Sequence, residues 1–348
     1  MEKTAIDLFT ASSADTVTQD TPVTPDHQEK QIASKSIANQ THEAKEVEIT
    51  EPPLTPQTIP GSQDKIQSSK PPEDYIDRVV AIMHDKYAGS ERATKKGIEN
   101  IGKELGIADS GKIWEAVELS WLLWYQAIYR QPISFDARLS QMVQFWNNVQ
   151  PTYEYSDSSK EIYKQYSTPC PIAAIVAQYT GMNKFKTVFD PSAGNGLLVL
   201  GAEPANTFVN EIDSTRIESL KFQGFKSVTT YNATQPFPEE YTGVFDIVVT
   251  NPPFARWEEE QFDRDIMVQK VFDNHIGLNH HLRLEQVMAG IALQCMKSSG
   301  KAALILMNHI YFDSDGHIAK YRPFFNWLYR HYFVDDVINM NSYKLYNK

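Results

Sequence analysis

The sequence predicts an α/β fold: a doubly wound, mostly parallel sheet that follows an N-terminal all-α domain and a disordered N-terminal tail. Three observations support this prediction. Between residues 187 and 307, short runs of β-branched and aromatic residues alternate with stretches at helical spacing, as in parallel α/β sheets. Between residues 76 and 148, apolar residues recur at helical spacing. Residues 1–70 follow neither period, so we expect three regions, at 1–70, 71–150 and 151–348.

The first region, residues 1–70, consists mainly of Thr, Ser, Gln, Pro and acidic side chains. Such a segment buries too little apolar surface to offset the entropy that ordering costs, so we expect a disordered tail or linker. Removing it is expected to change neither the melting temperature nor ligand binding. A docking motif within the tail is the alternative.

The composition indicates a globular protein for most of its length. Of 348 residues, 41% are hydrophobic and 11% aromatic, which is enough for a sizeable core. No apolar run approaches the roughly 18 residues of a membrane span, and the start lacks the features of a signal peptide. We therefore expect a cytoplasmic protein with no membrane partner. Cys170 and Cys295 have no metal-ligand spacing, so we expect two buried thiols.

The net charge of −11 is unusual for a protein that binds nucleic acid, because Lys and Arg contacts to phosphate normally supply much of the affinity. Part of the excess lies in residues 1–70, which hold 6 basic and 11 acidic side chains. Residues 151–348 hold 18 basic and 22 acidic side chains and show no basic stripe. We therefore do not expect the chain to hold DNA unaided.

Four helices are expected between residues 72 and 150. The first two are marked by apolar residues from Ile76 to Met83 and from Ile98 to Leu105, and the fourth covers 137–148. The third, at 112–130, is too aromatic on all sides to face solvent, so it is either buried or an interaction surface. Its tryptophans either pack in the core, which their helical spacing favours, or stack on unpaired bases.

Five strands are expected in the sheet, at residues 187–190, 207–210, 227–231, 245–249 and 302–307. A helix before the first strand is expected to begin with Thr168 as its N-cap and Pro169 in its first turn. A further helix at 284–296 leads through Ser298-Ser299-Gly300 into the fifth strand, and residues 333–340 can supply a sixth.

The loop after the first strand, Asp190-Pro-Ser-Ala-Gly-Asn-Gly196, has the features of a ligand-binding turn. Its two glycines let the backbone approach a ligand closely, and Asp190 at the end of the strand can accept hydrogen bonds from an ammonium group. A dinucleotide fingerprint would need a third glycine at position 199, where the sequence has Val. Glu211 follows the second strand, and a carboxylate there can bind both hydroxyls of a ribose.

The loop after the fourth strand, Thr250-Asn-Pro-Pro-Phe254, suits methylation of a planar amine. Two prolines fix φ and remove two N–H donors, so the carbonyl of Pro252 can point at a ligand beside the amide of Asn251. Two acceptors then converge on one NH2 group and free its lone pair to attack a methyl group. Phe254 offers a face on which a base can stack. The alternative is a plain turn that closes a strand.

These two loops carry a resemblance to a known family. Residues 190–196 resemble the S-adenosylmethionine loop of class I methyltransferases, and residues 251–254 resemble the catalytic loop of N6-adenine DNA methyltransferases. Their order matches the gamma arrangement, and the resemblance covers roughly residues 153–345. It implies S-adenosylmethionine as the cofactor, held by Tyr166, Thr168, Asp190, Ser192, Gly194, Gly196, Glu211, Asn232 and Asn251. It also implies a flipped adenine, held by Asn251, Pro252, Pro253 and Phe254.

The sequence departs from the family at the adenine end of the cofactor site. Relatives usually have Asp at or beside position 234, where this chain has Thr234. Asn232 or a backbone carbonyl is the expected substitute. Phe237 either packs on the adenine ring or belongs to the core.

The resemblance implies an adenine-specific DNA methyltransferase of restriction-modification type. Two alternatives remain open. One is a protein-glutamine or RNA amino-methyltransferase, although glutamine enzymes usually carry Tyr at the position of Phe254. The other is a non-catalytic module of a larger DNA-modification or mobile-element assembly, which the acidic charge and the tryptophan-rich helix favour. No metal is expected, since His275, His280 and His281 share no carboxylate or thiol partner.

The resemblance also bears on partners. Sheets of this family end in an antiparallel pair of strands, and gamma-type enzymes add a target-recognition region. Residues 341–348 are too short and polar for both, so we expect a piece truncated at its C-terminal edge or a recognition subunit. The chain alone is then expected to bind cofactor but to methylate DNA weakly and with little sequence preference.

Overall fold

The structure of the chain is a computed structural model, and it describes residues 75–150, 167–254, 269–272, 282–306 and 322–338. The predicted N-terminal tail lies outside these residues. Four helices come first: α1 (Tyr75–Ala88), α2 (Lys95–Glu104), α3 (Ser110–Tyr129) and α4 (Phe135–Asn148). Side chains of Thr94, Asp109 and Ser134 cap the last three by accepting hydrogen bonds from backbone N–H groups of the first turn. All four predicted helices are confirmed.

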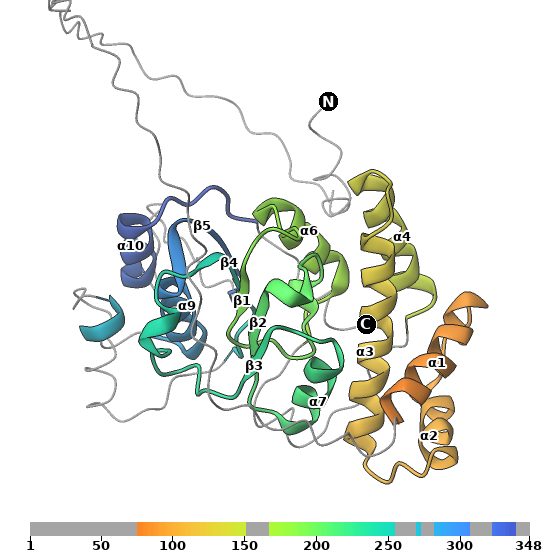
Figure 1. Cartoon of the computed structure of the whole chain (residues 1–348). Coiled ribbons are helices and arrows are strands. Elements are labelled where there is room, and N and C mark those ends of the chain that lie inside the picture. The colour runs from red at the N-terminus through yellow and green to blue at the C-terminus, as the bar shows by residue number, and fades with distance from the viewer. Residues whose placement is uncertain (1–74, 151–166, 255–268, 273–281, 307–321, 339–348) are drawn as a thin grey trace, which may run out of the picture. The chain divides into compact units, whose positions relative to one another are not determined.

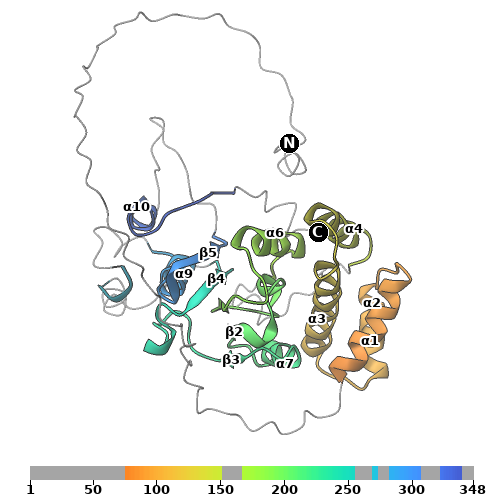
Figure 2. The same cartoon turned by 45° about the horizontal axis from the view of Figure 1, so that its top comes forward.

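A parallel sheet follows, with helices between its strands (Figures 1 and 2). The strands are β1 (Val188–Asp190), β2 (Thr207–Asn210), β3 (Ser227–Thr229), β4 (Phe245–Thr250) and β5 (Met296–Leu304). Their order is β3-β2-β1-β4-β5, and every described pair is parallel. The remaining helices are α6 (Cys170–Thr180), α7 (Ser214–Phe222), α9 (Leu284–Gln294) and α10 (Arg322–His331), with short 3-10 turns η1 (Leu197–Val199), η2 (Pro204–Asn206) and η3 (Glu239–Tyr241). The doubly wound sheet of the class I methyltransferase fold is therefore confirmed.

Three local predictions were wrong. Thr168 does not cap α6, which begins at Cys170 after Pro169, because the Thr168 hydroxyl accepts a hydrogen bond from Asn251 instead. Strand β5 begins at Met296, so residues 298–300 belong to it and not to a connecting loop. Residues 298–300 lie between Met296 and Lys301, which both pair with β4, in an irregular stretch of the ladder that a polar Ser-Ser-Gly sequence does not reveal.

The third wrong prediction is the sixth strand at 333–340. Residues 333–338 form no strand in the part of the chain that the structure describes, and residues 339–340 lie outside it. Phe333 is 91% exposed. The residues that were expected to form a strand therefore have no neighbouring strand among the described residues.

The two faces of the sheet have different cores. Val188, Val209 and Ile247 pack in one hydrophobic cluster together with α1 to α4, α6 and η1. The other face of the sheet carries a group of aromatic rings, among which the ring centroids of Phe189 and Phe245 lie 4.8 Å apart. The pairing of β4 with β5 is irregular between Phe245 and Ile247, where the extra residues lie in β5, between Met296 and Lys301.

Helix α3 lies at the centre of the cluster that joins the helices to the sheet. Trp114 and Trp121 are 1% and 3% exposed, so they pack in the core and are not available for stacking on bases. Glu115 and Glu118 are buried as well, at 5% and 0% exposed. No helix among the described residues is long and apolar enough to cross a membrane. The proposed boundary between residues 71–150 and 151–348 stays a prediction, although one cluster spans it.

Candidate functional site

A cavity of about 280 Å³ lies at the carboxyl ends of the strands. The strand order reverses between β1 and β4, and ligands of doubly wound sheets bind at such a reversal. Most of the predicted site residues line this cavity: Thr168, Asp190, Ser192, Gly194, Glu211, Asn232, Asn251, Pro252, Pro253 and Phe254. The structure thus brings the two predicted loops to one place. Tyr166 lies outside the described residues, and Gly196 does not line the cavity.

The loop after β1 is held in a tight turn by glycine conformations. Gly194 and Gly196 have φ values of 56° and 90°, in the left-handed region that side chains with a Cβ rarely adopt. A Cβ on Gly196 would lie 3.2 Å from the ring of Phe225, so this position is also packed from behind. Gly196 therefore shapes the turn from outside the cavity, whereas Gly194 forms part of the wall.

Asp190 ends β1 at the floor of the cavity and is 1% exposed. One carboxylate oxygen accepts a hydrogen bond from the backbone N–H of Ser192 at 3.0 Å. Burial raises the pKa of Asp190 to about 8, an effect that the Ser192 hydrogen bond opposes and the nearby Glu211 reinforces. A cation in the cavity would favour the ionised form, so Asp190 is suited to accept hydrogen bonds from an ammonium group.

Glu211 follows β2 directly and is held by three backbone N–H groups. One carboxylate oxygen accepts from Gly194 at 2.8 Å, and the other accepts from Ile212 and Asp213 at 2.8 and 2.9 Å. Each carboxylate oxygen has two lone pairs, so the oxygen bonded to Gly194 can accept a further hydrogen bond from a ligand hydroxyl, whereas the other oxygen already accepts two. Glu211 therefore fixes the β1 loop and presents a carboxylate at the same time.

The loop after β3 is ordered by Asn232, whose side-chain oxygen accepts from the backbone N–H and hydroxyl of Thr234 at 3.0 and 2.8 Å. Asn232 and Thr234 both line the cavity. Phe237 does not line it, and its ring packs against Phe189 at 5.1 Å. Of the two roles considered for Phe237, the structure supports the core position.

The loop after β4 projects Asn251 into the cavity wall. The side-chain nitrogen of Asn251 donates a hydrogen bond to the hydroxyl of Thr168 at 2.9 Å. The side-chain oxygen, on the other side of the amide, is therefore the atom that accepts hydrogen bonds. Pro252 is buried, and Phe254 packs partly against the hydrophobic cluster. Residues 255–268, which follow the loop, lie outside the described residues.

Sequence reasoning missed Asn210, which is the last residue of β2. Its side-chain nitrogen donates to the carbonyls of Pro191 and Tyr231, and its oxygen accepts from Thr229 and Tyr231. Asn210 therefore ties together the loops after β1 and β3. A buried polar residue at the end of an apolar strand is the signal that would have marked it.

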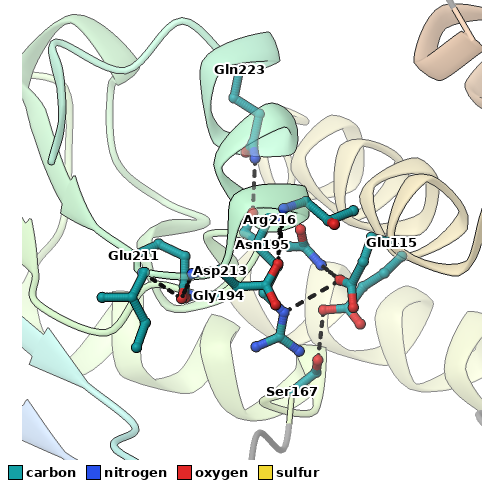
Figure 3. A network of polar contacts seen from close by, with 11 residues as sticks. Glu115, Ser167, Gly194, Asn195, Glu211, Asp213, Arg216 and Gln223 are labelled. Atoms are coloured by element: carbon teal, nitrogen blue, oxygen red, sulfur yellow. Dashed lines mark hydrogen bonds and ion pairs between the residues drawn. The ribbon is translucent and has the colours of Figure 1, made fainter. Parts of the chain in front are cut away.

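A buried polar cluster next to the cavity was also missed (Figure 3). Glu115 of α3 accepts from the side chain of Asn195 at 2.6 Å and lies 3.4 Å from Arg216 of α7. Asn195 and Arg216 are 1% and 4% exposed, and both line the cavity. Burial lowers the pKa of Arg216, but the carboxylates around it, Glu115 first, raise that pKa by more, so Arg216 stays charged. The signal in the sequence that could have revealed this cluster is a pair of glutamates, Glu115 and Glu118, within an aromatic helix.

The cavity as a whole suits a nucleoside that carries charged groups. It is lined by three carboxylic acids and one guanidinium, with an acceptor amide on the opposite loop. Among the described residues, no group of three His, Cys, Asp or Glu side chains is arranged to hold a metal ion. The three histidines considered in the sequence lie outside those residues.

A comparison with protein-family models finds one match, to part of the chain. The model of the Eco57I restriction-modification methylase family matches residues 198–346. No curated protein matches the sequence.

Solved structures with some likeness include three of interest. The chain is 23% identical to a provisionally assigned RNA methyltransferase from Pyrococcus horikoshii, over 36% of this chain and 60% of that one, with a TM-score of 0.25. It is 16% identical to a type I restriction-modification methyltransferase subunit from Streptococcus thermophilus, over 43% of this chain and 36% of that one, with a TM-score of 0.34. For the type IIG restriction endonuclease BpuSI, the identity is 14%, over 65% of this chain and 28% of that one, with a TM-score of 0.30.

The alignments thus cover less than two thirds of each of these solved structures. The family match falls on the part of the chain that contains β2 to β5 and the loop at 251–254. It confirms the resemblance that the two loops indicate: over residues 198–346, the chain is similar to restriction-modification methylases.

Proposed function

We propose that the chain transfers a methyl group from S-adenosylmethionine to the N6 amino group of adenine in DNA. One observation carries this proposal: the loop at 251–254 lines the same cavity as Asp190 and Glu211. A methyl donor and a planar amine must meet in one cavity, and these residue types suit the two ligands.

The cofactor half of the proposal rests on the loops after β1 and β2. Glu211 accepts a ribose hydroxyl through the oxygen that is bonded to Gly194, Asp190 accepts from the ammonium group, and Gly194 lets the backbone approach the ligand. Asn232, which lines the cavity, takes the role of the family's usual Asp toward the adenine ring. When bound, S-adenosylmethionine supplies an electrophilic methyl group.

The catalytic half rests on the loop after β4. Asn251 and the carbonyl of Pro252 accept the two hydrogens of the target amino group, which leaves its lone pair available for attack. Acceptors fixed in advance stabilise the charge that develops on the nitrogen, and holding the amine in line removes much of the entropic barrier. Flipping the adenine out of the duplex costs a few kcal/mol, and stacking on Phe254 returns about 1–3 kcal/mol.

DNA recognition is proposed to need more than this chain. A net charge of −11 opposes binding to phosphates, and among the described residues the charged groups of the cavity are mostly acidic. A recognition subunit or a further region of the polypeptide would supply the phosphate contacts and the base readout. The chain alone should then methylate slowly and with little sequence preference.

The test is incubation of the full chain with S-adenosylmethionine labelled in its methyl group and with unmethylated DNA, RNA or peptide, at high enzyme concentration. We expect label in DNA, in a base that nucleoside analysis identifies as N6-methyladenine. Label only in RNA or peptide would move the substrate to another planar amine. Cofactor binding without any transfer, even with the partner present, would favour a non-catalytic module.

A further inference from the structure

One pair of hydroxyl groups joins the two loops of the cavity. The side-chain oxygens of Ser192, in the loop after β1, and Thr250, the last residue of β4, lie 2.8 Å apart and share a hydrogen bond in which either can donate. Thr250 is 0% exposed, whereas Ser192 lines the cavity. The roles proposed above use neither hydroxyl. The resemblance implies that Ser192 binds the cofactor, but this contact indicates a different task.

The buried hydroxyl of Thr250 depends on this contact. Within the part of the chain that the structure describes, Ser192 is its hydrogen-bond partner. A buried hydroxyl without a partner costs free energy, and Val would suit a strand at least as well as Thr does. The useful feature of Thr at position 250 is therefore its hydroxyl, which ties the end of β4 to the loop after β1.

The next residue, Asn251, is held from the other side. It precedes Pro252, which favours an extended backbone, and successive side chains of an extended segment point to opposite sides. Thr250 is bonded to Ser192, whereas the Asn251 side chain donates to Thr168, which lies just before α6. Hydrogen bonds on both sides therefore restrict rotation of the chain about its own axis at residues 250 and 251.

Rotation about this axis would swing the side-chain amide of Asn251. Its oxygen is the proposed acceptor for the target amino group, and acceptors contribute most when they are fixed in advance. A misplacement of about 1 Å can cost about a hundredfold in rate. The backbone N–H of Ser192 in turn donates to the carboxylate of Asp190 at 3.0 Å. Ser192 therefore connects the catalytic loop to the turn that is proposed to bind the cofactor.

We propose that Ser192 is a positioning residue for methyl transfer: its hydroxyl holds Thr250, and through Thr250 it fixes the direction of the Asn251 acceptor relative to the cofactor. This inference rests on the proposed function, which names the reaction. Ser192 is then a residue of the cofactor loop whose loss lowers the rate of transfer and leaves the affinity for the cofactor unchanged.

Ser192→Ala and Thr250→Val each remove one half of the contact, and the double variant removes both. With saturating cofactor and DNA, we expect each single variant to transfer the methyl group about fivefold more slowly in a single turnover, the effect of one neutral hydrogen bond. The double variant should also be about fivefold slower, because both changes break the same contact. Calorimetry with S-adenosylhomocysteine should give affinities within about twofold of the wild type for all three variants.

Thr207→Val is the matched control for Thr250→Val. Thr207 is also a strand residue that is 0% exposed, and its hydroxyl donates to the carbonyl of Glu203 at 2.7 Å, away from the two loops. This variant loses the same atoms at the same burial, so its transfer rate should stay within about twofold of the wild type. Thr250→Ser keeps the hydroxyl and should likewise restore the rate to within about twofold.

The double variant gives the decisive outcome. A loss of about twenty-five-fold would mean that the two hydroxyls act independently, and it would overturn the inference while the proposed function stands. A weaker cofactor affinity in Ser192→Ala alone would assign its hydroxyl to the cofactor, with the same consequence. A wild-type chain that transfers no methyl group would contradict the proposed function and, with it, the inference.

Amide hydrogen exchange on the wild-type chain covers variants that fail to fold. The backbone N–H of Ile305 donates to the carbonyl of Thr250 at 2.9 Å, and that of Lys226 donates to the carbonyl of Thr207 at 3.0 Å. Because the contact carries the ordering of the cofactor loop to the end of β4, S-adenosylhomocysteine should slow exchange at Ile305 at least about threefold and leave Lys226 unchanged. Equal slowing at both amides, or slowing at neither, would overturn the inference without any substitution.

Discussion

The two loops that meet in the cavity are held in place in different ways. The loop after β1 is fixed by polar contacts from four residues at three other elements: Asn210 and Glu211 at the end of β2, Glu115 of α3 and Gln223 after α7. The loop after β4 is stiffened by its own two prolines, and Asn251 donates to Thr168. Tertiary contacts therefore hold the first loop, whereas the second combines two prolines with fewer such contacts, from Thr168 to Asn251 and from Ser192 to Thr250.

This difference assigns separate tasks to the loops. A loop fixed from several sides is organised before the ligand arrives, which suits a cofactor that must bind in one orientation. A loop fixed by proline presents acceptors to a substrate that enters from outside. Substitutions in the first loop should mainly change affinity, and substitutions in the second should mainly change the rate of transfer.

The largest effect is expected from Asn251→Ala. It removes an acceptor that matters most in the transition state, so methyl transfer should fall by at least about a hundredfold, like the loss of one oxyanion-hole donor. Single-turnover transfer of labelled methyl measures it. Asn206→Ala is the control, because Asn206 also donates through its side chain but lies outside the cavity. A rate like that of the control would make the 251–254 loop structural.

The second effect concerns pH and Asp190. Because the pKa of Asp190 is raised to about 8, the ionised fraction of its carboxyl group increases as pH rises from 6 to 8. The ionised form is the one that favours a cationic ligand. We expect the affinity for S-adenosylmethionine to rise over this range by up to about tenfold per pH unit, and to be flat in Asp190→Asn. An equally steep profile in the variant would assign the titration to another group.

The same pKa predicts the opposite trend for stability without ligand. A carboxyl group whose folded pKa exceeds its unfolded value stabilises the fold below the unfolded pKa, and this contribution is lost as pH rises through about 8. Denaturant unfolding at pH 6 and pH 8 should show lower stability at pH 8, with the difference reduced in Asp190→Asn.

A smaller effect tests the turn itself. Gly196→Ala places a Cβ at φ 90° and 3.2 Å from Phe225, so we expect a loss of about 1–2 kcal/mol in the free energy of unfolding. Gly181→Ala is the control, with φ 70° but open space around the added Cβ, and should cost less. Equal losses in urea unfolding would show that contact with Phe225 adds nothing.

The smallest effect is expected from Thr168→Val, which removes the partner of the Asn251 amide and keeps the side-chain shape. A lost neutral hydrogen bond of about 1 kcal/mol corresponds to roughly a fivefold slower transfer. The rate should lie between those of the wild type and Asn251→Ala. A rate as low as that of Asn251→Ala would mean that Thr168 also contacts a reactant.

The same comparison explains what the sequence could predict. The glycine turn, the proline pair and the alternating strands are local in sequence, so the fold and the two loops could be predicted from residue types and spacing. The contacts of the first loop join residues such as Asn195 and Glu115, 80 positions apart, and only the fold brings them together. Arg216 and Glu118 were missed for this reason.

Local patterns also failed where tertiary pairing decides the structure. Ser298-Ser299-Gly300 has the composition of a turn, yet it lies in β5, between residues of that strand that pair with β4. Phe333 to Ile338 has the composition of a strand but forms none among the described residues. Thr168 is of a residue type that often caps helices, but its hydroxyl accepts a hydrogen bond from Asn251 instead.

The most direct test of the separate tasks is calorimetry of S-adenosylhomocysteine binding to Glu211→Gln and Asn251→Ala. Glu211→Gln replaces a carboxylate that holds three backbone N–H groups, so its affinity should fall at least about tenfold, whereas Asn251→Ala should stay within about threefold of the wild type. Equal losses in the two variants, or a larger loss in Asn251→Ala, would contradict the division of binding and catalysis between the two loops.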